Sequence, residues 1–169
     1  MLRNYKWEPS VIPPERRAEK LNQKAALILV TGEHEHDRKG VAKALENKLF
    51  DDGKVVYFLG IGNVLYGVDA DIERKQENRL EHMRRLAEVA NLMLDAGIIL
   101  VVAAAELTQE DLEVIKTAVQ PDWIETIWAG DTVTTDLVYD LHLPGGAVSE
   151  AVDQLKAYLQ DKGVIFRPW

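Results

Sequence analysis

The sequence contains no cysteine among its 169 residues. This absence excludes disulfide bonds, thiolate metal ligands and cysteine nucleophiles. The sequence also has no uninterrupted apolar run of about 18 residues, so it predicts neither a transmembrane helix nor a membrane partner. Residues 1–5 are not followed by an apolar stretch, as they would be in a secretory signal peptide. Together these absences predict a cytoplasmic protein.

An excess of positive charge is also absent, because the formal net charge is -8 at pH 7. Binding to nucleic acid generally requires a positive surface, so the composition argues against a nucleic-acid partner. Apolar residues are plentiful, at 47%, and the length suits one domain with a sizeable core. Residues 1–24 are polar and contain Pro9, Pro13 and Pro14, which predicts an arm or linker. Residues 25–169 are predicted to form the domain.

Apolar segments alternate with helical patterns along this domain. Five segments are predicted to be strands, namely residues 25–31, 55–59, 98–104, 123–128 and 137–143. Such continuous apolar runs are typical of strands buried on both faces. The pattern predicts a three-layer α/β fold with an open, mostly parallel sheet. Ligands of such sheets bind at the carboxyl ends of the strands, so the loops after the first three strands are where a site is expected.

The spacing of apolar residues also predicts the helices between these strands. A short helix is expected near residues 14–22 and a long one over residues 74–96, with Leu80 on its buried stripe. Thr108 and Ser149 are predicted to be the N-caps of two later helices. Residues 60–71 have no clear period and are predicted to be a loop.

Three segments match one family in an ungapped series from Thr31 to about Ala104. Residues 31–46 read TGEHEHDRKGVAKALE, residues 60–67 read GIGNVLYG and residues 78–85 read NRLEHMRR. The chain resembles the adenylylsulfate (APS) kinases, whose corresponding segments contain a G-x-x-x-x-G-K-S-T loop before I-A-N-A-L-E, then D-G-D-N-V-R-H-G and D-R-x-E-N-I-R-R. The resemblance implies a fold like that of the P-loop nucleoside-triphosphate hydrolases.

The family's phosphate-binding loop is degenerate in this chain. Glycines in such a loop let backbone N–H groups face the phosphates, a lysine bridges them, and a Ser or Thr hydroxyl holds Mg²⁺. The positions that correspond to this loop are Gly32, Glu35, Asp37, Arg38, Lys39 and Gly40. Here Glu35 and Asp37 replace two glycines, Arg38 replaces the lysine, and Lys39 replaces the hydroxyl. The family's ATP and Mg²⁺ are therefore predicted to be lost, so no cofactor is expected.

The magnitude of the charge repulsion supports this prediction. One unfavourable contact between unit charges near 4 Å costs about 4 kcal/mol at a surface-like dielectric. Micromolar binding of ATP is worth only about 8 kcal/mol in total. Two such contacts with acidic side chains would nearly cancel it.

The side of the site that binds the second substrate is also altered. The resemblance places Gly60 and Gly62 where the family has the carboxylates of D-G-D-N, so no catalytic residue is predicted. Leu65 replaces an arginine and Arg74 replaces a phenylalanine, both of which contact substrate in the family. A remnant of the substrate site is expected at Asn63, Arg79 and His82. Of these, His82 stands where the family has an asparagine.

The string Glu33–Asp37 is rich in histidine and carboxylate, which are common ligands of Zn²⁺ and Ni²⁺. His34 and His36 are weak candidates for metal ligands. Alternate residues of a loop rarely converge on one ion without supporting contacts, so the interpretation we favour is a solvated acidic loop and no metal. A metal-binding module remains an alternative.

These observations predict a catalytically inactive APS-kinase-like domain with a structural or regulatory role in sulfate activation. The alternative is an active or conditionally active kinase with a remodelled loop. The arm around Trp7 resembles the segment that precedes the kinase in fusions behind the GTPase subunit of sulfate adenylyltransferase. The resemblance therefore implies a fused GTPase domain or another protein of sulfate activation as the partner. It also implies a possible homodimer.

Overall fold

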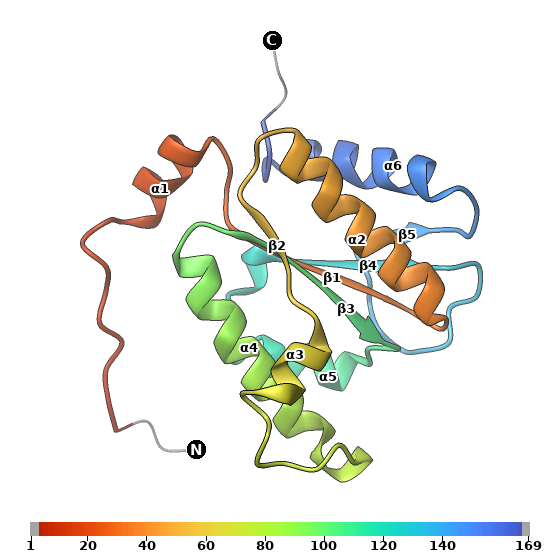
Figure 1. Ribbon diagram of the computed structural model, residues 1–169, viewed down its shortest axis with the longest axis horizontal. Helices are drawn as coiled ribbons and strands as arrows, with labels where there is room; N and C mark the ends of the chain where they lie inside the picture. The colour runs from red at the N-terminus through yellow and green to blue at the C-terminus, as the bar shows by residue number, and fades with distance from the viewer. Residues whose placement is uncertain (1–3, 167–169) are drawn as a thin grey trace.

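The computed structural model describes residues 4–166, which contain one five-stranded sheet (Figure 1). Its strands are β1 (Ala26–Gly32), β2 (Val56–Phe58), β3 (Ile99–Ala105), β4 (Ile124–Ala129) and β5 (Leu141–Leu143). They lie in the order β2-β3-β1-β4-β5, and every neighbouring pair is parallel. The predicted parallel α/β sheet is confirmed.

Helices cover both faces of the sheet. The helices of residues 4–166 are α1 (Pro14–Leu21), α2 (Glu35–Asp51), α3 (Ile61–Tyr66), α4 (Arg79–Asp95), α5 (Gln109–Ile115) and α6 (Val148–Asp161), with short 3₁₀ turns η1 (Gln76–Asn78) and η2 (Pro121–Trp123). All of the α-helices except α1 contribute buried residues to the core on one of the two faces. One core cluster joins α2 and α6 to one face of the sheet. The other joins α3, α4 and α5 to the opposite face. This arrangement confirms the three layers (Figure 1).

The central strand β1 is buried along its whole length, as its continuous apolar sequence predicts. Its odd-numbered leucines, Leu27 and Leu29, belong to one core cluster. Its even-numbered residues, Ile28 and Val30, belong to the other. Because successive side chains of a strand point to opposite faces, both faces of β1 must be apolar.

Two predictions about the segment between β2 and β3 were wrong. Residues 60–71 are not all loop, because Ile61–Tyr66 form α3. Two glycines concealed this helix from the sequence pattern, but burial of Val64 in the core stabilises it. The long helix begins at Arg79 rather than at residue 74, so Leu80 lies in its first turn and is 38% exposed.

Two further boundaries differ near the carboxyl end of the chain. The fifth strand is only Leu141–Leu143, although Leu137 is buried in the core from an irregular segment. Ser149 does not cap α6, which begins at Val148 after Ala147 and has no side-chain cap. In contrast, Thr108 forms the predicted cap of α5, as part of a capping box with Asp111.

The segment that precedes β1 contacts the domain. Helix α1 forms where predicted, and its Arg17 and Leu21 lie against Gly97 at the end of α4. Gln23 is fully buried, and its amide bonds the backbone of Val55 and Gly97. The boundary at residue 24 between an arm and the domain remains a prediction from the sequence. Within residues 4–166, no helix is both long and apolar enough to cross a membrane.

Candidate functional site

A cavity of about 430 Å³ lies at the carboxyl ends of β1, β2 and β3, where parallel sheets generally bind ligands. Its lining is Glu35, Arg38, Lys39, Lys43, Phe58, Gly60, Ile61, Gly62, Asn63, Leu65, Arg74, Ala103 and Ala105. The structure therefore brings together residues that the sequence singled out in two separate segments. A second cavity of about 300 Å³ adjoins it, and Arg79 and His82 line that one.

The segment that the resemblance matches to the family's phosphate loop is helical from Glu35 onward. Helix α2 begins at Glu35, and the amide of Arg38 already bonds the carbonyl of His34. The residues that stand in place of the loop glycines explain why a helix begins here. Glycine disfavours a helix by about 1 kcal/mol per residue, and carboxylates such as Glu35 and Asp37 favour the first helical turn through the helix dipole.

Gly32 retains the family's glycine for a reason unrelated to phosphate. A Cβ atom at Gly32 would lie 2.2 Å from the carbonyl oxygen of Ala129, at the end of the neighbouring strand β4. Any side chain at this position would therefore force two paired strands apart. The backbone packing at the ends of β1 and β4 is sufficient to require glycine here.

The basic side chains at the start of α2 have weak or exposed partners. The Arg38 guanidinium lies 3.4 Å from the carbonyl oxygen of Gly32 and 3.5 Å from that of Glu33. Lys39 donates a hydrogen bond to Glu35 across one helical turn. This bond, with smaller contributions from Arg38 and Arg74, holds the pKa of the Glu35 carboxyl below its ordinary value. The positive charges therefore act together around one carboxylate.

Two glycines line the cavity where the resemblance places the carboxylates of the family. Gly60 precedes α3 and Gly62 lies inside it, so neither position offers a side chain that could accept a proton. A Cβ atom at Gly62 would meet nothing within 4 Å. The absence of a carboxylate at Gly62 is thus not imposed by lack of space. Asn63 and Leu65 also line the cavity.

Arg79 is engaged in a structural contact. Its guanidinium bonds both carboxylate oxygens of Asp111 at 2.9 to 3.2 Å and the carbonyl oxygen of Ala105 at 2.9 Å. The Asp111 side chain is only 2% exposed. Burial acts to raise the pKa of Asp111, but the bonds from Arg79 and Thr108 outweigh it and hold that pKa below its ordinary value. The pair ties α4 to the start of α5.

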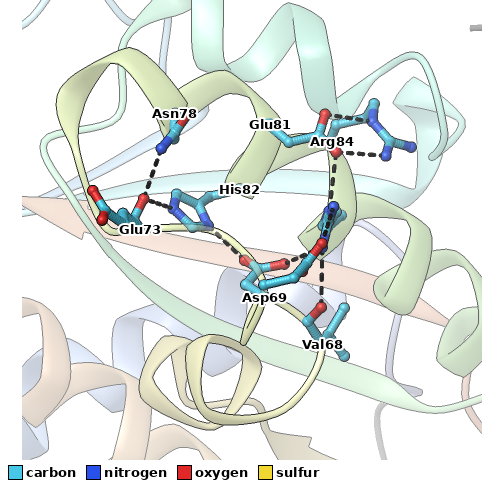
Figure 2. Close-up of polar contacts among 9 residues, drawn as sticks. Val68, Asp69, Glu73, Asn78, Glu81, His82 and Arg84 are labelled. Atoms are coloured by element: carbon cyan, nitrogen blue, oxygen red, sulfur yellow. Dashed lines mark hydrogen bonds and ion pairs between the residues drawn. The ribbon is translucent and has the colours of Figure 1, made fainter.

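His82 is also held by protein groups rather than left free for a ligand. Figure 2 shows its ring between Asp69 and Glu73, with Nδ1 2.7 Å from the Asp69 carboxylate and Nε2 3.2 Å from the Glu73 carbonyl oxygen. Asp69 is buried, and its other oxygen lies 3.9 Å from Arg85. Both ring nitrogens of His82 therefore face an oxygen atom of the protein.

The candidate metal ligands do not converge. His34 is the N-cap residue of α2, its side chain is 71% exposed, and its Nε2 lies 3.8 Å from a carboxylate oxygen of Glu33. His36 is exposed in the first turn of α2. Within residues 4–166, no group of three or more His, Asp and Glu side chains is placed to hold a metal ion. The alternative of a metal-binding module gains no support.

Sequence reasoning missed Lys43, Asp69 and Asp111 as members of these sites. Lys43 lies one helical turn after Lys39, so the helical period could have placed it in the cavity. Asp69 and Asp111 carry no such signal, because their partners lie 13 and 32 residues away in the chain.

An open parallel sheet, with a helix that starts directly after its central strand, gives this chain the fold of the P-loop kinases. The family profile for adenylylsulphate kinase matches residues 24–137. An adenylyl-sulfate kinase of Clostridium acetobutylicum is 35% identical over 122 residues, which are 72% of this chain and 61% of that relative. The chain belongs to the adenylylsulphate kinase family.

Solved structures agree on the fold. An APS kinase of Mycobacterium tuberculosis in complex with AMPPNP and APS has a TM-score of 0.70 at 20% identity, covering 82% of this chain and 99% of that one. A hexameric APS kinase from Thiobacillus denitrificans has a TM-score of 0.73 at 19% identity, covering 90% of this chain and 32% of that one. The chain spans 57% to 61% of the length of three bacterial relatives that it matches.

Proposed function

We propose that this chain is a non-catalytic member of the adenylylsulphate kinase family with a structural or regulatory role in sulfate activation. The observation that carries the proposal is the start of α2 at Glu35. A phosphate loop holds a triphosphate by curving its glycine amides around the anion. The helical first turn of α2 replaces that curve and adds the carboxylates of Glu35 and Asp37.

The cavity offers nothing to replace the lost chemistry. Phosphoryl transfer depends on positioning two substrates in line and on neutralising the developing charge with a metal ion. Gly60 and Gly62 provide no carboxylate, and the one carboxylate of the lining, Glu35, is paired with Lys39. Arg79 and His82 are held by Asp111 and Asp69. We therefore assign no cofactor, and we place the protein in the cytoplasm with the sulfate-activating enzymes.

The partner that we propose is another protein of sulfate activation, either a fused GTPase domain or a second copy of this chain. A relative named bifunctional enzyme NodQ, from Rhizobium, is 35% identical over 100 residues that make up 16% of its length. The similar kinase of Thiobacillus denitrificans is hexameric and far longer than this chain. Both support a domain that works within a larger assembly.

Rebuilding the loop tests the proposal. A variant with Glu35→Gly, Asp37→Gly, Arg38→Lys and Lys39→Ser should regain part of the affinity for Mg²⁺-ATP, because amides and a lysine hold phosphate. It should form no 3′-phosphoadenylyl sulfate. Each missing contact with the second substrate removes about ten- to a hundredfold in rate, which is about 1.4 to 2.7 kcal/mol.

The control for this assay is the Clostridium acetobutylicum relative, measured under the same conditions. Clear turnover by the rebuilt variant would mean that the loop was the only lesion. The chain would then be a recently silenced or conditionally active kinase, and the proposal that the contacts with the second substrate are also lost would be wrong.

A further inference from the structure

A further cavity of about 400 Å³ lies at the amino ends of β1 and β4, at the end of the sheet opposite the candidate site. This volume is within the range of small-molecule pockets. The walls come from α1, the end of α4, η2, the start of β4 and the segment that follows α6. No lining residue falls in residues 31–46, 60–67 or 78–85, the segments that match motifs of the kinase family. The cavity is therefore separate from the site described above.

The inner wall of this amino-end cavity is apolar. Leu94 at the end of α4 and Val164 after α6 are buried, and they belong to the two different core clusters. Trp123 of η2 is partly buried beside them, and Ala18 of α1 completes the wall. The cavity thus reaches both layers of the core at their open end. A ligand with an apolar body would be stabilised here because that body leaves water.

A buried carboxyl group also lines the cavity. Glu125 of β4 is 8% exposed, and the Tyr158 hydroxyl donates a hydrogen bond to its Oε2. Among residues 4–166, no group donates a hydrogen bond to its Oε1. Burial raises the pKa of the Glu125 carboxyl above its ordinary value, although the hydrogen bond from Tyr158 opposes this shift. Because a buried carboxylate is costly without donors, a ligand with a positively charged donor would stabilise it.

The rim of the cavity carries charges of both signs. Lys24, Lys162, Glu15 and Asp122 line it, and all four are exposed. Within the described part of the chain, none of them forms an ion pair, and the Lys162 ammonium lies 5.6 Å from the centre of the Tyr158 ring. Opposite charges that share one cavity without pairing leave both kinds of partner available. This lining favours a ligand that itself carries both signs.

We propose that the amino-end cavity binds a small zwitterion with an apolar body, of the class of the α-amino acids. Glu125 holds the ammonium group, and Lys24 and Lys162 hold the carboxylate. Such charge-assisted hydrogen bonds are stronger than neutral ones. The apolar side chain of the ligand packs against Leu94 and Trp123. A ligand with only one of the two charges leaves part of the lining without its partner.

This inference goes beyond the proposed function and does not rest on it, because it concerns the other end of the sheet. One wall of the cavity is α1, through Pro14 and Ala18, and the others belong to the domain. A bound amino acid would contact both parts and hold α1 against the domain. Its concentration would therefore control how firmly α1, and the arm before it, are attached.

Calorimetry with phenylalanine, phenethylamine and phenylpropionate tests the inference, because the three share one apolar body and differ only in their charged groups. Phenylalanine should bind with a dissociation constant of about 1 mM or tighter. Each of the other two should bind about tenfold more weakly or not at all, since each has lost its bonds to one charged partner. Equal affinity for the three probes, or no heat with phenylalanine, would overturn the inference.

Substitutions assign the two ends of the ligand. Glu125→Gln keeps an acceptor for Tyr158 and should remove the advantage of phenylalanine over phenylpropionate. Lys24→Met with Lys162→Met should remove its advantage over phenethylamine. Lys20→Met is the matched control, because Lys20 is exposed on α1 but does not line the cavity. Affinity for phenylalanine that is unchanged in the first two variants would contradict the proposal, and circular dichroism checks that all of them fold.

Hydrogen exchange of the unmodified protein locates the binding without any substitution. Saturating phenylalanine should slow amide exchange in α1 and leave α3, which lines the cavity at the carboxyl end, unchanged. Protection of α3 without α1 would place the ligand in the other cavity and overturn the inference. None of these results depends on whether Mg²⁺-ATP binds, so the proposed function stands or falls separately.

Discussion

The starts of α2 and α4 both correspond to binding segments of the kinase family, but they have diverged in different ways. At α2 the family residues are replaced, and the new side chains are exposed and weakly bonded, as with Glu35 and Lys39. At α4 Arg79 persists and is bonded to buried Asp111. The difference teaches that buried Asp111 gives Arg79 a structural role that the exposed pair of α2 does not have.

Breaking the Arg79 contact should have the largest effect on stability. Arg79→Ala leaves the Asp111 carboxylate buried without its cation, which typically costs about 3 to 5 kcal/mol. Urea unfolding at pH 7 measures the loss. Arg84→Ala, on the same helix and paired with half-exposed Glu81, should cost a small fraction of that amount.

The stability lost on the substitution Arg79→Ala should also depend on pH. The pKa of Asp111 is held below its ordinary value of 3.8 in the folded protein, so the stability from this contact is present above that pH. It is lost as the pH falls through the lowered pKa. The difference between the wild type and Arg79→Ala should therefore shrink in acid. Equal stability of the two proteins at pH 7 would contradict the structural role of Arg79.

Gly32 at the end of β1 and Gly62 in α3 offer a second comparison, between a packed and an open glycine position. Gly32→Ala places a Cβ atom 2.2 Å from the Ala129 carbonyl oxygen, and overpacking of this kind costs about 1 to 3 kcal/mol. Gly62→Ala meets nothing within 4 Å and lies in a helix, so it should be neutral or slightly stabilising. Thermal unfolding of both variants measures the contrast. A Gly32→Ala variant as stable as Gly62→Ala would refute the packing account of Gly32.

The smallest effect is expected for the pair at the start of α2. Lys39 and Glu35 are 46% and 63% exposed, and exposed ion pairs add little to stability. Lys39→Ala should leave the urea midpoint unchanged within error. A clear destabilisation would show that the new residues of this segment were selected to hold the fold, against the contrast drawn with α4.

The sequence predicted the sheet well because β1 and β3 are continuous apolar runs, which only a doubly covered parallel strand requires. It missed α3 because Gly60 and Gly62 conceal a helix that depends on the burial of Val64. The resemblance to the kinase family pointed to the loop positions where residues differ. It could not reveal that Glu35 starts a helix, or that Arg79 has Asp111 as its partner 32 residues away.

Titration of the unmodified protein with Mg²⁺-ATP, followed by an assay for 3′-phosphoadenylyl sulfate, tests the central claim most directly. The helical start of α2 and the carboxylates of Glu35 and Asp37 predict no binding tighter than about 10 µM, equivalent to roughly 7 kcal/mol. They also predict no product from adenylylsulfate. Micromolar affinity together with turnover would contradict the account and identify the chain as a working kinase.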